Sequence, residues 1–373
     1  MKRPGMRVAF VVNGSPGSAM AIRAGSLAKR FQRFEIRLVY RQSNRLRSLS
    51  GMAKDLLSWQ PKVCCVFDHA LDGVLMAMLA KLLLGCVFIL DTGDAIVEIG
   101  KALGRGSVGL ALTRGLEVAG FRTADQIVVR SRYHQNWLGR QGFRAEVVPD
   151  GVDANQFAPD ASSIVEPKQR RPLKIGVLGS CTWSPSLKLC YGWELVQVLR
   201  LLPAEFARGV FIGDGDGLPR LRRQAEEAGV AERMEFQGRV PYADLPRRLH
   251  ELDICLSTQT NDLAGRVRTT GKLPLYLAAG RFVLATRVGT AAEVLPERML
   301  IDYEDTLDAG YPQKLAQRIE SLAQQGEAFG YQPHCVELAR RHFDYQTLAC
   351  KYECIVERAA QRGRGFIGNS RNG

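Results

Sequence analysis

Short apolar strands alternate with amphipathic helices along most of this 373-residue sequence. Near-continuous apolar runs, which are typical of parallel strands buried on both faces, occupy residues 6–12, 36–40, 63–67, 86–90, 126–129, 145–148, 173–178, 210–212, 234–236, 254–256 and 282–285. Strands that alternate with helices predict a parallel α/β sheet. Because the chain is too long for one ordinary core, we expect two tandem Rossmann-like, doubly wound domains.

Helices are expected between these strands. Residues 20–34 place Met20, Ala24 and Leu27 on one stripe and leave Arg23 on the outer face. The apolar run 73–90 is interpreted as a buried helix followed by a strand rather than a membrane span, because a charged Lys81 and Gly85 interrupt it. Further helices are predicted at 100–121, 189–201, 272–279, 313–325 and 333–360.

A turn and a polar, proline-containing segment divide the chain near its middle. Pro149, Asp150 and Gly151 form the turn, because proline fixes φ and glycine accepts positive φ. We therefore predict a first domain at 1–160, a linker at 161–172 and a second domain at 173–340. A helix at 341–360 would pack back towards the first domain, and the Gly- and Arg-rich residues 361–373 would be a disordered tail.

Residues 147–159, V-V-P-D-G-V-D-A-N-Q-F-A-P, closely resemble the (V/I)-P-N-G-V-D-x-x-x-F-x-P segment that joins the two halves of GT-B glycosyltransferases. The likeness is greatest to the large retaining family 4 type, the glycosyl transferases group 1. Similar motifs of that family's donor domain follow in order at 211–215, 236–240, 252–256, 276–286 and 289–293. The resemblance implies a GT-B fold with a C-terminal helix. It also implies an enzyme that transfers a sugar, hexosyl in type, from a nucleotide-sugar donor, with retention.

The donor site is expected at the strand ends of the second half. Gly179, Gly213 and Gly215 there would let backbone N–H groups approach phosphate. A pyrophosphate also needs cations, and the run from Arg266 through Arg268 to Lys272 supplies three; a solvated basic turn is the alternative. Other candidates for contact with the donor are Ser180, Lys188, Asp214, Thr270 and Glu293.

One departure from the family pattern concerns the Glu-x7-Glu pair that the resemblance implies around the helix at 272–279. Val267 and Leu275 occupy the corresponding positions, and neither side chain can hydrogen-bond a ribose. Thr269, Thr270 or Glu293 could replace the missing contact. The departure also leaves open a non-catalytic GT-B-like protein. Another nucleotide-sugar enzyme on the same fold, such as an epimerase, is a further alternative.

Two loops of the first half resemble acceptor-side segments of the family. Asp68-His69 matches a loop where relatives carry H-x-H or H-D, and residues 91–98 match D-x-H-D-x-x-x-E with Gly93 in place of the histidine. The resemblance implies that Asp94 and His69 orient acceptor or sugar hydroxyls as the catalytic candidates. A satisfied loop histidine is the alternative for His69.

Positive charge is concentrated in the first half. Residues 1–150 hold 22 Lys and Arg against 11 Asp and Glu, a formal charge of +11, whereas the rest of the chain carries +2. A basic domain suits an anionic membrane surface or a lipid-linked acceptor. The basic motifs interleaved with aromatics that mark RNA-binding modules do not occur. A cytoplasmic protein, or one that is peripheral at the cytoplasmic membrane face, is thus expected.

Cofactor and metal chemistry have no signature in the sequence. The nine cysteines lack paired spacing and are interpreted as reduced, mostly buried residues. Asp214 and Asp216 lie in a glycine turn and do not form a credible Mg²⁺ motif. We therefore expect no cofactor and no metal, with a nucleotide sugar as the donor substrate.

Overall fold

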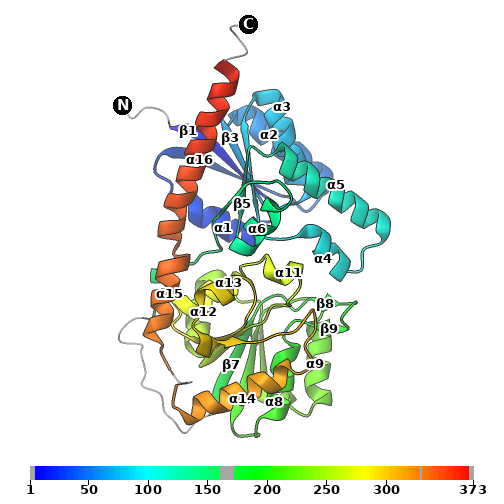
Figure 1. Cartoon of the computed structure of the whole chain (residues 1–373), viewed down its shortest axis with the longest axis vertical. Coiled ribbons are helices and arrows are strands. Elements are labelled where there is room, and N and C mark those ends of the chain that lie inside the picture. Colours follow the sequence, from blue (N-terminus) through cyan, green and yellow to red (C-terminus); the bar gives the residue numbers. More distant parts are fainter. Residues whose placement is uncertain (1–4, 160–171, 328–329, 369–373) are drawn as a thin grey trace. The chain divides into compact units, whose positions relative to one another are not determined.

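The computed structural model describes residues 5–159, 172–327 and 330–368, which form two compact units. The first unit comprises Met1–Gly100, Gly106–Gly151 and Tyr345–Gly373, and the second comprises Lys101–Arg105 and Val152–Asp344. Each unit is built around one six-stranded parallel sheet (Figure 1). The predicted linker at 161–172 lies almost wholly outside the described residues.

The sheet of the first unit has the order β2-β1-β3-β4-β5-β6, and every neighbouring pair is parallel. The order reverses between β1 and β3, which is the switch point of a doubly wound sheet. The strands are β1 (Met6–Val12), β2 (Phe34–Tyr40), β3 (Val63–Phe67), β4 (Val87–Thr92), β5 (Gln126–Val129) and β6 (Ala145–Val147).

Helices cover both faces of this sheet because successive strand side chains point in opposite directions. Val8, Phe10 and Val12 pack under α1 and α16, whereas Ala9 and Val11 pack with residues of α2, α3 and α5 (Figure 1). The helices are α1 (Ala19–Ala28), α2 (Arg45–Trp59), α3 (Leu71–Leu84), α4 (Ile96–Ala102), α5 (Ser107–Thr123), α6 (Arg132–Gly139) and α16 (Tyr345–Gly368).

The second unit repeats this plan with the order β11-β10-β7-β12-β13-β14. Its strands are β7 (Leu173–Leu178), β10 (Ala207–Ile212), β11 (Met234–Gly238), β12 (Ile254–Ser257), β13 (Phe282–Thr286) and β14 (Leu300–Ile301). A short hairpin, β8 (Trp183–Ser184) and β9 (Leu189–Cys190), follows β7. The prediction of two tandem Rossmann-like, doubly wound domains is therefore confirmed.

The helices of the second unit pack around a single core, in which α8 contacts α9 and α14, and α12 contacts α15. The helix predicted at 272–279 is α12, and Gly280 follows it in the left-handed conformation with φ 65°. The α-helices are α7 (Ala154–Phe157), α8 (Trp193–Leu201), α9 (Leu218–Glu227), α10 (Leu245–His250), α11 (Leu263–Arg266), α12 (Lys272–Ala278), α13 (Gly289–Val294), α14 (Tyr311–Gln324) and α15 (Pro333–Phe343). The described residues also form the 3₁₀ turns η2 (Ala231–Arg233), η3 (Tyr242–Asp244) and η4 (Glu297–Met299).

Several predicted helix boundaries are corrected by the structure. The helix expected at 100–121 is divided into α4 and α5 around Gly104, whose φ is 71°. The helix expected at 189–201 starts only at Trp193, because the β8–β9 hairpin takes the preceding residues. The helix expected at 333–360 is interrupted at the extended Asp344. In the segment expected to be a tail, α16 continues to Gly368, and 369–373 lie outside the described residues.

The apolar run at 73–90 forms α3 and β4, as predicted, but α3 is not wholly buried. Leu82 is 81% exposed and Leu83 is 57% exposed. Lys81 reaches the surface, where it donates to the Thr123 carbonyl at 2.9 Å and pairs with Asp125 at 2.6 Å. Among the helices that the structure describes, none has the length and apolar character needed to cross a bilayer.

Candidate active site

Glycine turns close the strand ends at the carboxyl edge of the second sheet. Gly179 follows β7, and Gly213 and Gly215 follow β10, with φ values of 155°, 150° and 151°. A Cβ atom on Gly213 would overlap the carbonyl oxygen of Gly179, and one on Gly215 would overlap that of Cys181. Only glycine fits such a close approach of backbone to backbone.

The N–H groups of these glycines are bonded within the protein. Gly179 donates to the Ile212 carbonyl at 3.0 Å, Gly213 to the Gly238 carbonyl at 2.8 Å, and Gly215 to the Asp214 carboxylate at 2.8 Å. They are therefore not free to bind a phosphate in this structure, contrary to the expectation from the sequence. The glycines bring strand ends together, and contacts to an anion at this edge must come from other groups.

Lys272 is linked through Tyr191 to the end of β7. It begins α12, its Nζ donates to the phenolic oxygen of Tyr191, and Nζ lies 4.1 Å from the centroid of that ring. A Cβ on Gly179 would lie 2.8 Å from the Tyr191 ring. Burial lowers the pKa of Lys272 to about 7. A diphosphate at this edge would supply a negative counter-charge for the Lys272 ammonium group.

Tyr191 and Tyr276 fix the end of β7 and were missed by sequence reasoning. The Tyr276 hydroxyl accepts from the Leu178 N–H at 2.6 Å, and the Tyr191 hydroxyl donates to the Leu178 carbonyl at 3.4 Å. Aromatic residues beside a helix look like core in the sequence. Only the fold shows that both hydroxyls meet at one strand end beside Lys272.

The segment that runs from Arg266, the last residue of α11, through Arg268 to Thr270 is tied to the ends of β12 and β13. Thr270 Oγ1 lies 3.4 Å from Ser257 Oγ at the end of β12. A Cβ on Gly289 would lie 3.0 Å from the carbonyl oxygens of both Arg266 and Arg268, so α13 starts directly against this segment. The Arg266 Nε donates to the Asn261 side chain at 2.8 Å. The fold therefore brings Arg266, Arg268, Thr270 and Lys272 to one edge of the sheet.

The remaining candidates of the second unit are exposed. Ser180 follows Gly179, and Glu293 lies on α13. Lys188 sits in the turn of the β8–β9 hairpin with φ 53°. Asp214 accepts from the Gly215 N–H, and Asp216 accepts from the Trp183 N–H at 3.0 Å, so both carboxylates shape the turn.

Val267 and Leu275 belong to the core, where their side chains are 0% and 8% exposed. The positions at which the family resemblance implies a glutamate pair are therefore filled by buried apolar packing. A nucleotide cannot reach the Val267 side chain without rearrangement of this core.

His69, the first acceptor-side candidate, is buried behind α5. Its Nε2 lies 3.2 Å from the Leu116 carbonyl, and its ring packs edge-on against Phe121 at 5.0 Å. Burial lowers the pKa of His69 to about 4, so the ring is neutral at physiological pH. The geometry favours a positioning role for His69 over direct contact with a substrate.

Asp94, the second candidate, is half-buried in the turn after β4. Next to it, a Cβ on Gly93 would lie 2.5 Å from Cδ of Arg130. The Arg130 side chain thus fills the space beside Gly93, the position at which the family resemblance implies a histidine. The carboxylates of Asp68, Asp91, Asp94 and Asp150 all raise the pKa of Arg130.

Arg23 is buried, which corrects the expectation that it lies on the outer face of α1. It donates from Nη2 to the Asp91 carboxylate at 2.9 Å and to the Val148 carbonyl at 2.9 Å. Asp150 lies 3.5 Å from both Arg23 and Arg130. This buried charge cluster, formed by Arg23, Arg130, Asp91 and Asp150, joins α1, β4, β5 and the turn after β6. Sequence periodicity missed it because charged residues on a helix are assigned to the surface.

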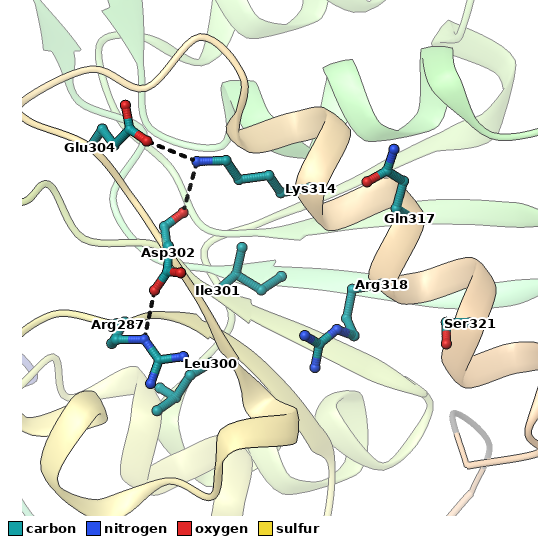
Figure 2. A pocket seen from close by; sticks show the side chains of 9 residues that line it. All are labelled: Arg287, Leu300, Ile301, Asp302, Glu304, Lys314, Gln317, Arg318 and Ser321. Atoms are coloured by element: carbon teal, nitrogen blue, oxygen red, sulfur yellow. Dashed lines mark hydrogen bonds and ion pairs between the residues drawn. The ribbon is translucent and has the colours of Figure 1, made fainter.

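A cavity of about 540 Å³ lies elsewhere, beside the edge strand β14 and α14 (Figure 2). Four of its charged groups form two pairs: Arg287 bonds Asp302 at 2.6 Å, and Lys314 lies 3.7 Å from Glu304. None of the predicted site residues lines it. We therefore place the candidate site at the carboxyl edges of the sheets and not in this cavity.

The potential metal ligands and the cysteines are scattered over the described part of the chain. Within 5–159, 172–327 and 330–368, no three His, Cys, Asp or Glu residues are grouped so as to hold a metal ion. Seven of the nine cysteines are buried, and Cys350 and Cys354 are exposed on α16.

Comparison with solved structures shows that the chain shares its fold with glycosyltransferases. The Anabaena Alr3699/HepE structure in complex with UDP and glucose aligns with a TM-score of 0.72 at 17% identity, over 95% of this chain and 100% of that one. Sucrose-phosphate synthase from Thermosynechococcus elongatus aligns with a TM-score of 0.73 at 14% identity, over 95% and 98%. WaaG, a glycosyltransferase of lipopolysaccharide biosynthesis, aligns with a TM-score of 0.62 at 14% identity, over 94% and 99%.

These likenesses establish the GT-B fold, and sequence comparison adds the class of protein. Residues 175–325 match the family model of glycosyl transferases group 1, and this range covers most of the second unit. No curated protein matches the chain by sequence. The chain is thus a glycosyltransferase with the GT-B fold. Its second unit carries the glycosyl transferases group 1 domain, with which the retaining family 4 type is consistent.

Proposed function

We propose that this enzyme moves a hexosyl group from a uridine diphosphate sugar to an acceptor bound by the first unit, with retention at the anomeric carbon. The observation that carries the proposal is the contact of Lys272, at the start of α12, with Tyr191, which also bonds the end of β7. The Anabaena neighbour contains UDP and, in another complex, UDP-glucose, which supports the choice of nucleotide.

In this proposal Lys272 contacts the diphosphate, with Arg266 and Arg268 as the neighbouring cations. Thr270, tied to Ser257, would donate a hydroxyl hydrogen bond. Glu293, exposed on α13, would take over the ribose contact that Val267 and Leu275 cannot make. Ser180 and Lys188 would line the outer part of the site. Gly179, Gly213, Gly215 and Asp214 shape the edge without contacting phosphate through the glycine N–H groups.

On the acceptor side, Asp94 would orient a hydroxyl, and His69 would act behind it as a positioning residue. Retention needs no protein nucleophile if the leaving diphosphate assists the incoming hydroxyl. The half-buried Asp94 and the neutral, buried His69 are compatible with this division of roles.

An anionic membrane surface is the partner that we propose for the first unit. Helix α3 exposes leucines, and α5, which contacts α3, exposes Val108 and Leu112 at 74% and 72%. Lys81, Arg114 and Arg122 add positive charge to the same two helices. Phe121 of α5 is 4% exposed and belongs to the core. A lipid-linked acceptor would be met at such a surface.

The donor proposal is tested by thermal shift of the full chain with UDP, GDP and ADP, followed by product analysis with UDP-glucose. We expect UDP to raise the melting temperature, since a ligand at 100 times its dissociation constant adds about 2.7 kcal/mol. Release of UDP from UDP-glucose identifies transfer, whereas conversion to UDP-galactose identifies an epimerase. No shift with any diphosphate would contradict the proposal and favour a non-catalytic protein.

A further inference from the structure

Two arginines and one buried aspartate lie together at the carboxyl edge of the first sheet. Arg41 directly follows β2, and its N–H donates to the Val12 carbonyl at 3.0 Å. Arg45 is the first residue of α2, and Asp72 lies in the first turn of α3. Helices α2 and α3 contact each other (Figure 1). The fold therefore gathers these three charged side chains from three separate elements.

The Asp72 carboxylate holds each guanidinium group by the same nitrogen atom. Arg45 Nε donates to Asp72 Oδ1 at 3.1 Å, and Arg41 Nε lies 3.3 Å from Oδ2. The Asp72 side chain is 4% exposed, whereas those of Arg41 and Arg45 are 45% and 57% exposed. Neither arginine makes another side-chain hydrogen bond or ion pair within the part of the chain that the structure describes. The Nη atoms of both are therefore available to a ligand.

Two features of this group of three indicate that an anion belongs to it. The first is a surplus of one positive charge, since two guanidinium groups face a single carboxylate and one would be enough to neutralise it. The second is the Oδ2 atom of Asp72, which is buried and accepts no hydrogen bond within the described residues. Buried polar atoms without a partner are rare and require an explanation. An anion that shifts the Arg41 side chain could let Nε complete a hydrogen bond to Oδ2.

We propose that Arg41 and Arg45 bind a phosphate group of the acceptor, with Asp72 as a positioning residue beneath them. The proposal rests on the function proposed above, because it assigns the ligand to the acceptor of the first unit. Planar guanidinium groups form paired hydrogen bonds with phosphate oxygens. Because one buried carboxylate already holds both, little side-chain freedom is lost when the phosphate binds. Lipid headgroups and soluble sugar phosphates share this phosphomonoester chemistry.

The test measures the binding of glycerol 3-phosphate to the full chain by isothermal titration calorimetry, with UDP at saturation to occupy the donor site. We expect glycerol 3-phosphate to bind and glycerol not to bind. Arg41→Gln and Arg45→Gln should each weaken binding about tenfold, since each removes charged hydrogen bonds. Arg47→Gln is the matched control. It removes the same charge from α2, but residues two apart on a helix do not face each other, so the affinity should change less than about twofold.

Asp72→Asn separates a positioned pair of arginines from simple attraction by charge. The substitution adds one unit of positive charge, so attraction alone would tighten the binding of glycerol 3-phosphate. We instead expect binding about fivefold weaker, because both guanidinium groups lose the carboxylate that holds them. Arg45→Lys, which keeps the charge but not the planar donor group, should also weaken binding. Tighter binding by Asp72→Asn, in a variant that melts like the unaltered chain, would overturn the positioning role.

Vesicles separate the two sources of phosphate. Phosphatidylcholine vesicles that contain phosphatidic acid are compared with vesicles in which phosphatidylserine supplies the same surface charge. A preference for phosphatidic acid that is lost in the Arg41→Gln, Arg45→Gln chain assigns the phosphate to a lipid. Binding of glycerol 3-phosphate without that preference assigns it to a soluble acceptor. Binding of neither probe, or equal weakening by Arg47→Gln, would overturn the site. UDP binding and UDP release from UDP-glucose, measured separately, report on the donor proposal alone.

Discussion

In the proposed donor site, we expect Lys272 to make binding depend on pH. Its ammonium group is buried beside Tyr191, which moves its pKa from an ordinary value near 10.5 to about 7. Because the folded pKa lies below the unfolded one, the folded state loses this proton first. The lysine therefore adds to the free energy of unfolding as pH rises from about 7 towards 10.5. Binding of a diphosphate has the opposite sign, since it favours the charged lysine.

We therefore predict that the affinity for UDP falls as pH rises from 7 to 9, by up to about tenfold per pH unit if only the charged lysine binds. Isothermal titration calorimetry across this range checks it. Lys272→Arg, which stays charged, should flatten the profile, and Lys54→Arg on the exposed face of α2 should leave it unchanged. A pH-independent affinity in the unaltered enzyme would remove Lys272 from the donor site.

Arg23 illustrates how a single buried charge can hold a domain together. Its guanidinium joins the Asp91 carboxylate to the last carbonyl groups before the turn at Asp150. Arg23→Met should lower the free energy of unfolding of the first unit by about 3 kcal/mol or more, because Asp91 would lose its main partner. Arg358→Met, which removes an exposed pair with Glu146, should cost under about 1 kcal/mol. Thermal melts of both variants provide the comparison, and similar melting temperatures would contradict this reading of the cluster.

At the scale of the element, the glycine turns of the second sheet set how closely its strand ends approach. Gly213→Ala places a methyl group against the Gly179 carbonyl, and we expect a loss of about 2–4 kcal/mol in stability together with weaker UDP binding. Gly229→Ala, at φ 68° with no atom near its Cβ, isolates the backbone strain and should cost about 1 kcal/mol. Equal costs for the two, measured by urea unfolding, would show that the close approach is unimportant.

Helices α3 and α5 carry the prediction about membranes. We expect the chain to co-sediment with anionic liposomes at low salt and to be released at high salt, since basic residues contribute roughly 1 kcal/mol each near such a surface. Leu82→Gln combined with Leu112→Gln should reduce the bound fraction several-fold. Leu307→Gln, an exposed leucine of the second unit, is the control. No binding at low salt would direct the search towards a soluble acceptor.

The regular elements could be predicted from sequence, because their apolar periodicity is local. The strand that ends at Leu178 and the helix that begins at Lys272 are both visible as patterns. The contacts that make the site are not local: Tyr191 meets Lys272 across 81 positions, and Arg23 meets Asp91 across 68. Hydropathy also assigns Arg23 to the surface and His134 to the core. No sequence pattern reveals that the buried Arg23 guanidinium has hydrogen-bond partners, whereas the ring nitrogens of His134 have none among the described residues.

At the scale of the whole molecule, the first unit is assembled from both ends of the chain. Tyr352 of α16 stacks on Phe67 at 5.8 Å and contacts Phe10 at 6.1 Å between ring centroids, so residues near the C-terminus complete the core that β1 begins. The second unit, in contrast, is nearly continuous in sequence.

A chain that stops after Asp344 should therefore lose the cooperative melting of its first unit and bind hydrophobic dyes, because the Phe10 and Phe67 side of the sheet is left uncovered. A chain that stops after Arg362 keeps the Tyr352 contacts and should melt like the full one. Differential scanning calorimetry of the two truncated chains measures whether the first unit of each melts cooperatively. Cooperative melting of both units in the shorter chain would show that α16 is dispensable for the core.

The position of α16 also fixes an order of events during synthesis. The ribosome makes β1 to β6 first, yet the helix that closes their core is made last, after Val152–Asp344. At 5–20 residues per second, the first unit waits roughly 10 to 40 seconds with one face of its sheet exposed. The unit that is translated second can fold first. We therefore expect a growing chain to need shielding of that apolar face, by a chaperone or by the ribosome surface, until α16 emerges.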